Sequence, residues 1–262
     1  MKTFDFDVCS SFLREIEFGP GYKIASVNRR DLMTIQELVK EQFLAVIAEV
    51  SPEHWHHFKN QCLSSYHILA EKLELAHEQI WCKQRRIFDE KLLSKFKGTN
   101  FYSDLRNIFG EFLISDEENL SYENVYWRLV RPGKPDVGPV HADEWFWKLG
   151  HGKMPANCFR LKLWLALFTE PGLNGLRVVP NSHKKNDWRY HAVFKDGIYK
   201  PVIDHELESL DLYNLPLNSG EYIIFHDRLL HGGIPGTGRI TRFSVEFTLI
   251  IPEDKLKHTN LR

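Results

Sequence analysis

Three polar side chains in the second half of the chain have the types and the spacing needed to bind a metal ion. His141 and Asp143 are two positions apart, and His231 lies far downstream, directly before Gly232-Gly233. Residues two apart on an extended strand end face the same side, so this imidazole and this carboxylate can converge on one ion. The pattern predicts a metal site made by His141, Asp143 and His231.

The chemistry of this ligand set favours iron over structural zinc. Two histidines and one carboxylate on one face of an ion form the facial triad of non-haem Fe(II) oxygenases, which leaves positions open for a chelating 2-oxoacid and dioxygen. A structural zinc site would favour thiolates, and the four cysteines are scattered with no C-x-x-C pair. A histidine and an aspartate two apart are a weak signal alone in a chain with 13 histidines. The assignment of the metal site therefore depends on the neighbouring motifs.

A second pair, Arg242 and Ser244, follows His231 on an expected strand. The two share a face, and an arginine with a hydroxyl beside it suits a carboxylate such as the far end of 2-oxoglutarate. Arg239 is the rival for this role. Arg242 is favoured because Ser244 is its partner on the same face.

These motifs, taken in order, resemble the phytanoyl-CoA dioxygenase-like family of Fe(II)/2-oxoglutarate-dependent oxygenases. The resemblance covers about residues 120–250, and residues 1–119 carry no matching motif. It rests on His141-Ala142-Asp143, on the run from Leu173 to His183, on Gly220 to His226 leading to His231-Gly232-Gly233, and on Arg242-x-Ser244.

The resemblance implies the cofactors and the roles of individual residues. His141, Asp143 and His231 would bind Fe(II), Arg242 with Ser244 would anchor 2-oxoglutarate, and O2 would be the oxidant. Trp164 would line the cosubstrate site. Related halogenases replace the aspartate with a small residue, so the carboxylate at Asp143 favours hydroxylation, or another oxidation such as desaturation, over halogenation.

The sequence departs from the family pattern in two places. Asn181 stands where the family usually has glycine in the turn that reads Pro180-Asn181-Ser182-His183, and asparagine also tolerates positive φ. The loop 144–158, which begins with Glu-Trp-Phe-Trp, contains three aromatic residues. Such loops at a barrel mouth usually bind substrate or act as lids.

The elements that must position these residues change character near residue 120. Residues 31–49 have helical spacing, and a long helical region, in one or two pieces, is expected over about 53–97. After residue 120 the runs 123–131, 159–168, 176–179, 221–226 and 243–250 have the texture of short strands, punctuated by Pro and Gly.

We therefore expect an α+β fold with a mainly β core. A helical N-terminal layer, residues 1–119, would pack on a double-stranded β-helix (a jelly roll, cupin-like) over 120–252, which would carry the catalytic site. The whole chain, 1–262, would form a single domain.

Composition limits the function classes. The 34 basic and 35 acidic residues give a net charge of −1, so nothing favours a nucleic acid or an anionic membrane as partner. The N-terminus does not read as a signal peptide, and no apolar stretch is long enough to span a bilayer, which predicts a cytoplasmic protein.

The expected partner is a small-molecule substrate, and nearby Lys and Arg residues, including Arg128 and Arg131, allow it an anionic group. Oligomeric state stays open. Two alternatives are kept: a cupin-like metal-dependent hydrolase or isomerase, and a non-catalytic jelly-roll binding module.

Overall fold

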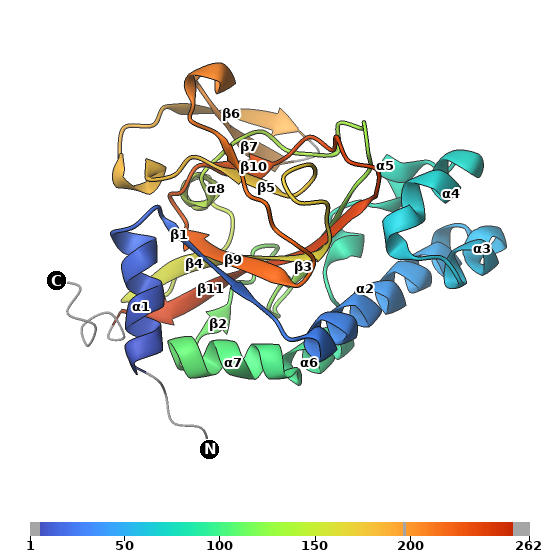
Figure 1. Cartoon of the computed structure of the whole chain (residues 1–262), viewed down its shortest axis with the longest axis horizontal. Helices are drawn as coiled ribbons and strands as arrows, with labels where there is room; N and C mark the ends of the chain where they lie inside the picture. Colours follow the sequence, from blue (N-terminus) through green and yellow to red (C-terminus); the bar gives the residue numbers. More distant parts are fainter. Residues whose placement is uncertain (1–5, 196–197, 254–262) are drawn as a thin grey trace.

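The computed structural model describes residues 6–195 and 198–253, and the chain divides into a helical layer and stacked antiparallel sheets (Figure 1). The helices of the N-terminal region are α1 (Phe6–Glu17), α2 (Arg29–Val50), α3 (Trp55–Lys59), α4 (Tyr66–Lys72), α5 (His77–Ile80), α6 (Glu90–Lys97) and α7 (Asn100–Phe109). Short 3-10 turns occur at η1 (Pro52–His54), η2 (Leu63–Ser65), η3 (Gln84–Arg86), η4 (Ser182–Lys184) and η5 (Leu207–Ser209).

The largest sheet is antiparallel, with the strand order β1-β9-β4-β11-β2 and with β3 also paired to β11. Its strands are β1 (Tyr22–Ser26), β2 (Leu113–Ile114), β3 (Tyr126–Val130), β4 (Cys158–Phe168), β9 (Glu221–His226) and β11 (Arg242–Pro252). A smaller sheet has the order β10-β5-β8, from β5 (Leu176–Val178), β8 (Tyr213–Asn214) and β10 (His231–Gly233), and β6 (Tyr190–Lys195) pairs with β7 (Ile198–Ile203) as a hairpin.

The alternation of side chains along β4 shows how the layers are built. Leu161, Leu163 and Leu165 belong to the core that the main sheet shares with the helices, whereas Trp164 and Ala166 belong to a second core with strands β5 and β9. Successive residues of a strand face opposite sides. The main sheet therefore has one face on the helical layer and the other toward the small sheet, and Figure 1 shows α2, α6 and α7 on one side and β5 and β10 on the other. This is the predicted double-stranded β-helix with a helical N-terminal layer.

The helical layer is more interrupted than the sequence predicts. The helix expected over 31–49 is α2, which begins after Asn28, whose side chain accepts a 2.9 Å hydrogen bond from the amide of Asp31. The region 53–97 does not form one or two long helices, and that prediction is wrong. It breaks into short helices because Phe58, Tyr66 and Trp81 turn inward to pack on Phe43 of α2.

Three further differences concern strands. β1 and β2 lie within residues 1–119 and yet belong to the main sheet, where Tyr22 pairs with Phe225 and Ile114 with Leu249. The β6–β7 hairpin had no counterpart among the expected strands. The loop 144–158 begins as a short helix, α8 (Asp143–Lys148). None of the described helices combines the length and the apolar character that crossing a bilayer requires.

Candidate metal centre

The three side chains singled out by spacing meet at one point between the two sheets. One ligand atom from each of His141, Asp143 and His231 lies within 4.8 Å of the others. The Nε2 atoms of His141 and His231 are 3.6 and 3.8 Å from Asp143 Oδ1. Of the described residues, no other group of histidine, cysteine or acidic side chains has this arrangement.

Backbone pairing brings the two histidines together. His141 and His231 form an isolated antiparallel bridge in which each amide donates to the other's carbonyl at 2.9 Å. Residues paired in this way have their side chains on the same face. His231 is the first residue of β10 and pairs with Val178 of β5, so the small sheet carries it into the interior.

Asp143 reaches the same point from a different element. Ala142 is extended, with φ −109° and ψ 139°, and Asp143 is the first residue of α8 instead of a strand residue. The amide of Glu144 donates to the carbonyl of Asp227 at 2.9 Å and fixes the start of this helix beside the end of β9. A helix start tolerates a carboxylate, because backbone N–H groups point toward it.

The donor set fits a divalent metal ion. Nδ1 of His141 lies 2.8 Å from the carbonyl of Pro139, and Nδ1 of His231 lies 2.9 Å from that of Leu229. Carbonyls only accept, so each Nδ1 carries the proton and each Nε2 is left with a lone pair for a metal. Asp143 Oδ2 is buried and has no hydrogen-bond partner among the described residues, which a metal ligand would explain.

Arg242 and Ser244 lie on the inner face of β11. Arg242 is 5% exposed, and its Nη1 donates to the carbonyl of Gly175 at 2.8 Å. Its Nε and the hydroxyl of Ser244 are buried without partners among the described residues. The guanidinium lies 5.8 Å from the ring centre of Trp164, which is 3% exposed. Arg239, the rival, has a 94% exposed side chain beside Glu170.

The sequence matches the family model described as phytanoyl-CoA dioxygenase over residues 3–244. The chain belongs to the phytanoyl-CoA dioxygenase family. It is accordingly a non-haem Fe(II) enzyme that uses 2-oxoglutarate and O2, and family membership decides against the hydrolase, isomerase and binding-module alternatives.

Solved structures agree on the fold. The apo non-haem monooxygenase ThoJ aligns with a TM-score of 0.55 at 11% identity over 94% of this chain and 79% of its own. The 2-oxoglutarate-dependent carbocyclase SnoK of nogalamycin biosynthesis aligns at 0.53, with 13% identity over 96% and 87%. EctD from S. alaskensis with 2-oxoglutarate and 5-hydroxyectoine aligns at 0.52, with 14% identity over 92% and 74%. No curated protein matches the sequence significantly.

Burial and charge keep the converging side chains in forms that suit metal binding. Burial opposes the charge on Asp143, but Lys162, His231 and His141 outweigh it and hold the pKa of that carboxyl well below its usual range. Burial lowers the pKa of His231 to about 4. At neutral pH the carboxylate is therefore ionised and His231 is neutral, which are the forms that bind metals.

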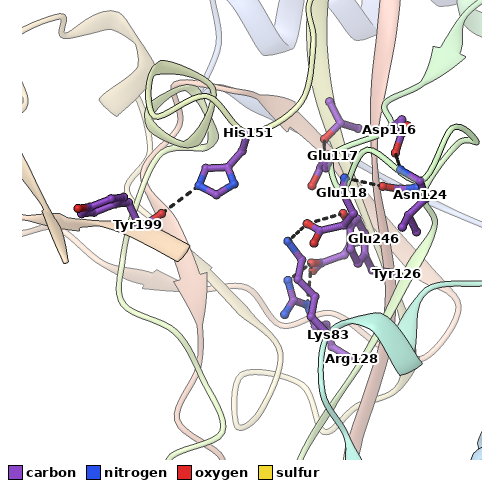
Figure 2. A network of polar contacts seen from close by, with 12 residues as sticks. Lys83, Asp116, Glu117, Glu118, Asn124, Tyr126, Arg128, His151, Tyr199 and Glu246 are labelled. Atoms are coloured by element: carbon purple, nitrogen blue, oxygen red, sulfur yellow. Dashed lines mark hydrogen bonds and ion pairs between the residues drawn. The ribbon is translucent and has the colours of Figure 1, made fainter. Parts of the chain in front are cut away.

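The inner wall also carries acidic and basic residues outside the predicted site, of which the sequence analysis named only Arg128. Arg128 of β3 pairs with Glu246 of β11 at 2.7 Å (Figure 2). The ammonium of Lys162 lies 3.4 Å from Glu117. A polar residue at every second position of β11, from Arg242 to Thr248, was the available signal. Arg131, named with Arg128 as a group that allows an anionic substrate, is held by Asp136 through two 2.8 Å hydrogen bonds.

The aromatic loop 144–158 follows Asp143 and contacts the β6–β7 hairpin. His151 Nε2 is 3.0 Å from the carbonyl of Tyr199 in the β6–β7 hairpin, on the opposite side of Figure 2 from the Arg128 pair. The ring of Trp145 stacks on that of Tyr190 at 4.6 Å. A groove of about 500 Å³ runs between this loop, α1 and the start of β4, beside the triad and not over it.

Proposed function

We propose that this enzyme hydroxylates an unactivated C–H bond of a small-molecule metabolite and converts 2-oxoglutarate to succinate and CO2. In this proposal His141, Asp143 and His231 bind the iron, and Arg242 with Ser244 and Trp164 binds the cosubstrate. The observation that carries it is the convergence of these three ligand side chains on one face, with a buried and incompletely satisfied arginine on the inner wall of the same barrel.

The bound iron and 2-oxoglutarate would supply the oxidising chemistry. The chain's residues would orient both. The Nε2 atoms of His141 and His231 and the carboxylate of Asp143 would hold the ion. The free Nε of Arg242 and the Ser244 hydroxyl are donors for the far carboxylate of 2-oxoglutarate. Trp164, whose ring centre lies 5.8 Å from the guanidinium, would line the cosubstrate site beside it.

A small-molecule substrate is supported by the fold. EctD, which shares the architecture, was determined with 2-oxoglutarate and the small solute 5-hydroxyectoine. Nothing in the composition favours a nucleic acid, since basic and acidic residues balance. The cytoplasmic location expected from the sequence stays a prediction.

The test begins with purified protein under anaerobic conditions. We expect Fe(II) and 2-oxoglutarate to bind together and, on admission of O2, slow formation of succinate even without the primary substrate. His141→Ala should abolish both, while His191→Ala, which changes an exposed histidine, should leave both intact. Binding of Fe(II) with no oxygen-dependent loss of 2-oxoglutarate in the parent protein would reject the proposal.

A further inference from the structure

The groove of about 500 Å³ beside the metal centre has the aromatic loop 144–158 as one of its sides. Trp147 of α8 lines it from that side, and Leu13 lines it from α1. The groove lies where β9 no longer covers β4, since the pairing of these two strands begins at Leu161, opposite His226. The residues of β4 that precede this pair therefore have an edge that β9 leaves free, and the groove runs beside it.

The groove adjoins the metal centre through helix α8. Asp143 is the first residue of this helix and Trp147 is four positions later, so the two side chains lie on the same side of it. Glu144 lines the groove, and its amide donates to the carbonyl of Asp227, another lining residue, at 2.9 Å. A molecule in the groove therefore lies about one helical turn from a predicted metal ligand.

Arg160 of β4 is the basic group of this groove that has no acidic partner. Its guanidinium lies 4.2 Å from the ring centre of Trp147, and its Nε donates to Met154 Sδ, a weak acceptor, at 3.0 Å. Among the described residues no carboxylate forms an ion pair with it, and its two Nη groups make no hydrogen bond. Burial lowers the pKa of this guanidinium, and nearby carboxylates, of which Asp227 acts most strongly, offset the effect only in part.

Three acidic side chains also line the groove, and each of them lies beside a different basic residue. Glu144 pairs with Lys148 at 2.7 Å. Glu17 lies 3.6 Å from Nε2 of His226, and Asp227 lies 3.0 Å from Nδ1 of the same ring. The half-buried guanidinium is thus the cation of the groove that an anionic ligand would compensate.

We propose that Arg160 binds an anionic group of the primary substrate, a carboxylate or a phosphate, and that the groove holds the rest of that molecule. The inference rests on the proposed function, because it takes the triad as the place of reaction. A planar guanidinium placed on an aromatic ring offers a fork of N–H donors that matches two oxygens of such a group. The carbon skeleton would be buried on the apolar walls. These walls are formed by Leu13, Ile16, Phe159 and Leu161.

The experiment separates cosubstrate binding from binding in the groove. Full-length protein is loaded with Mn(II) and titrated calorimetrically with 2-oxoglutarate, which tests the proposed function. The loaded complex is then titrated with benzoate, with phenyl phosphate and with the neutral benzyl alcohol, which share one ring. The variants are Arg160→Gln and Arg160→Lys. The control is Lys153→Gln, which changes an exposed lysine of the same loop that does not line the groove.

We expect the parent and Lys153→Gln to bind one anionic probe per chain, and to bind it more tightly than benzyl alcohol. Arg160→Gln should weaken the binding of the anion by about tenfold or more, because a charge-assisted hydrogen-bonded pair is lost, and should leave the binding of benzyl alcohol unchanged. Arg160→Lys should restore part of the affinity. The arm with the tighter binding identifies the carboxylate or the phosphate.

Nuclear magnetic resonance then tests whether the groove serves the metal centre. In the parent loaded with Mn(II), the ring protons of the bound anion should show broadened signals, because the paramagnetic ion is close, and the same sample with Mg(II) should not. Signals that Mn(II) leaves sharp would place the probe away from the metal and exclude this site as the substrate site.

Two outcomes of the calorimetry would also overturn the inference. Equal affinity of the parent and Arg160→Gln for the anions excludes the residue. A parent that binds neither anion more tightly than benzyl alcohol has no anion site in the groove. If the parent already fails to bind 2-oxoglutarate, the proposed function fails, so the two failures are distinguished. Arg160→Lys, which keeps the charge but loses the fork, serves if Arg160→Gln does not fold.

Discussion

Asp143 is a buried carboxylate in the candidate centre, and its Oδ2 has no hydrogen-bond partner among the described residues. A metal ion would compensate that oxygen, and an amide could not replace it as an anionic ligand. We expect Asp143→Asn to weaken Mn(II) binding by at least about 100-fold, more than the loss of an outer-shell partner. Electron paramagnetic resonance of free Mn(II) measures this. Asp227→Asn, a nearby acid outside the triad, should bind Mn(II) normally. Equal affinity in the two variants would contradict the assignment.

At the same scale, Arg242 differs from Arg239 in burial, since the first is 5% exposed and the second has a 94% exposed side chain. Removing a buried cation from a charged pair costs on the order of 2–5 kcal/mol. Arg242→Gln should therefore weaken 2-oxoglutarate binding to the Mn(II) form by about 30-fold or more, and Arg239→Gln should not change it. Calorimetric titration of the Mn(II) form of each variant with 2-oxoglutarate measures these affinities. The reverse ranking would assign the cosubstrate to Arg239.

Single residues were predictable from sequence where a strand or a short turn fixes their direction. Pairs of residues spaced two apart, and the order of the motifs along the chain, were enough to select His141, His231 and Arg242 as candidates. The bridge between Ile87 and Tyr126 could not be found in this way, because it joins a region without a motif to the edge of β3. Long-range pairing of this kind leaves no local pattern in the sequence.

Among the elements, helix α5 shows how the helical layer is joined to the barrel. His77 is its first residue and is 9% exposed. Its Nδ1 lies 3.0 Å from the hydroxyl of Tyr66, which accepts from Trp81 Nε1 at 2.8 Å. Periodicity over 53–97 predicted helix in general, but it could not show where the helix breaks. The breaks occur where these aromatic residues must face α2, so tertiary packing overrides helix propensity.

The burial of His77 at the start of α5 predicts that stability depends on pH. Burial, with the charge of Arg131, lowers the pKa of His77 from 6.5 to about 4. Between those values the unfolded chain binds a proton that the folded chain does not, so the free energy of unfolding decreases as pH falls from 6.5 to 4. The contribution is on the order of 3 kcal/mol at most.

His77→Gln should flatten this slope, which urea unfolding at several pH values measures. His56→Gln, at an exposed histidine, should keep the parent's slope. If His77→Gln loses stability with acid as steeply as the parent, another group is responsible.

At the scale of the whole molecule, one hydrophobic core joins the helical layer to the main sheet. Residues of α2, α6 and α7 belong to the same cluster as the outer face of β4 and β11. The fold class was predictable because strand texture and helical texture separate near residue 120. The contribution of β1 and β2 to the sheet was not, because two short strands within a helical region look like connections. The two layers should therefore unfold together.

Substitution of Phe43 tests whether the two layers unfold together, because its ring contacts side chains of both layers. It stacks on Trp81 at 4.7 Å and meets Phe243 of β11 at 6.3 Å. Phe43→Ala should lower the free energy of unfolding by about 3–5 kcal/mol, through the buried surface lost and the cavity left behind. Circular dichroism and tryptophan fluorescence, which reports Trp81 of the helical layer as well as Trp164 of the barrel, should still show one coincident transition in urea, shifted to lower concentration. Met33→Ala, on the same helix but 55% exposed, should leave the midpoint unchanged. Two separate transitions in Phe43→Ala would mean that the helical layer and the barrel are independent folding units.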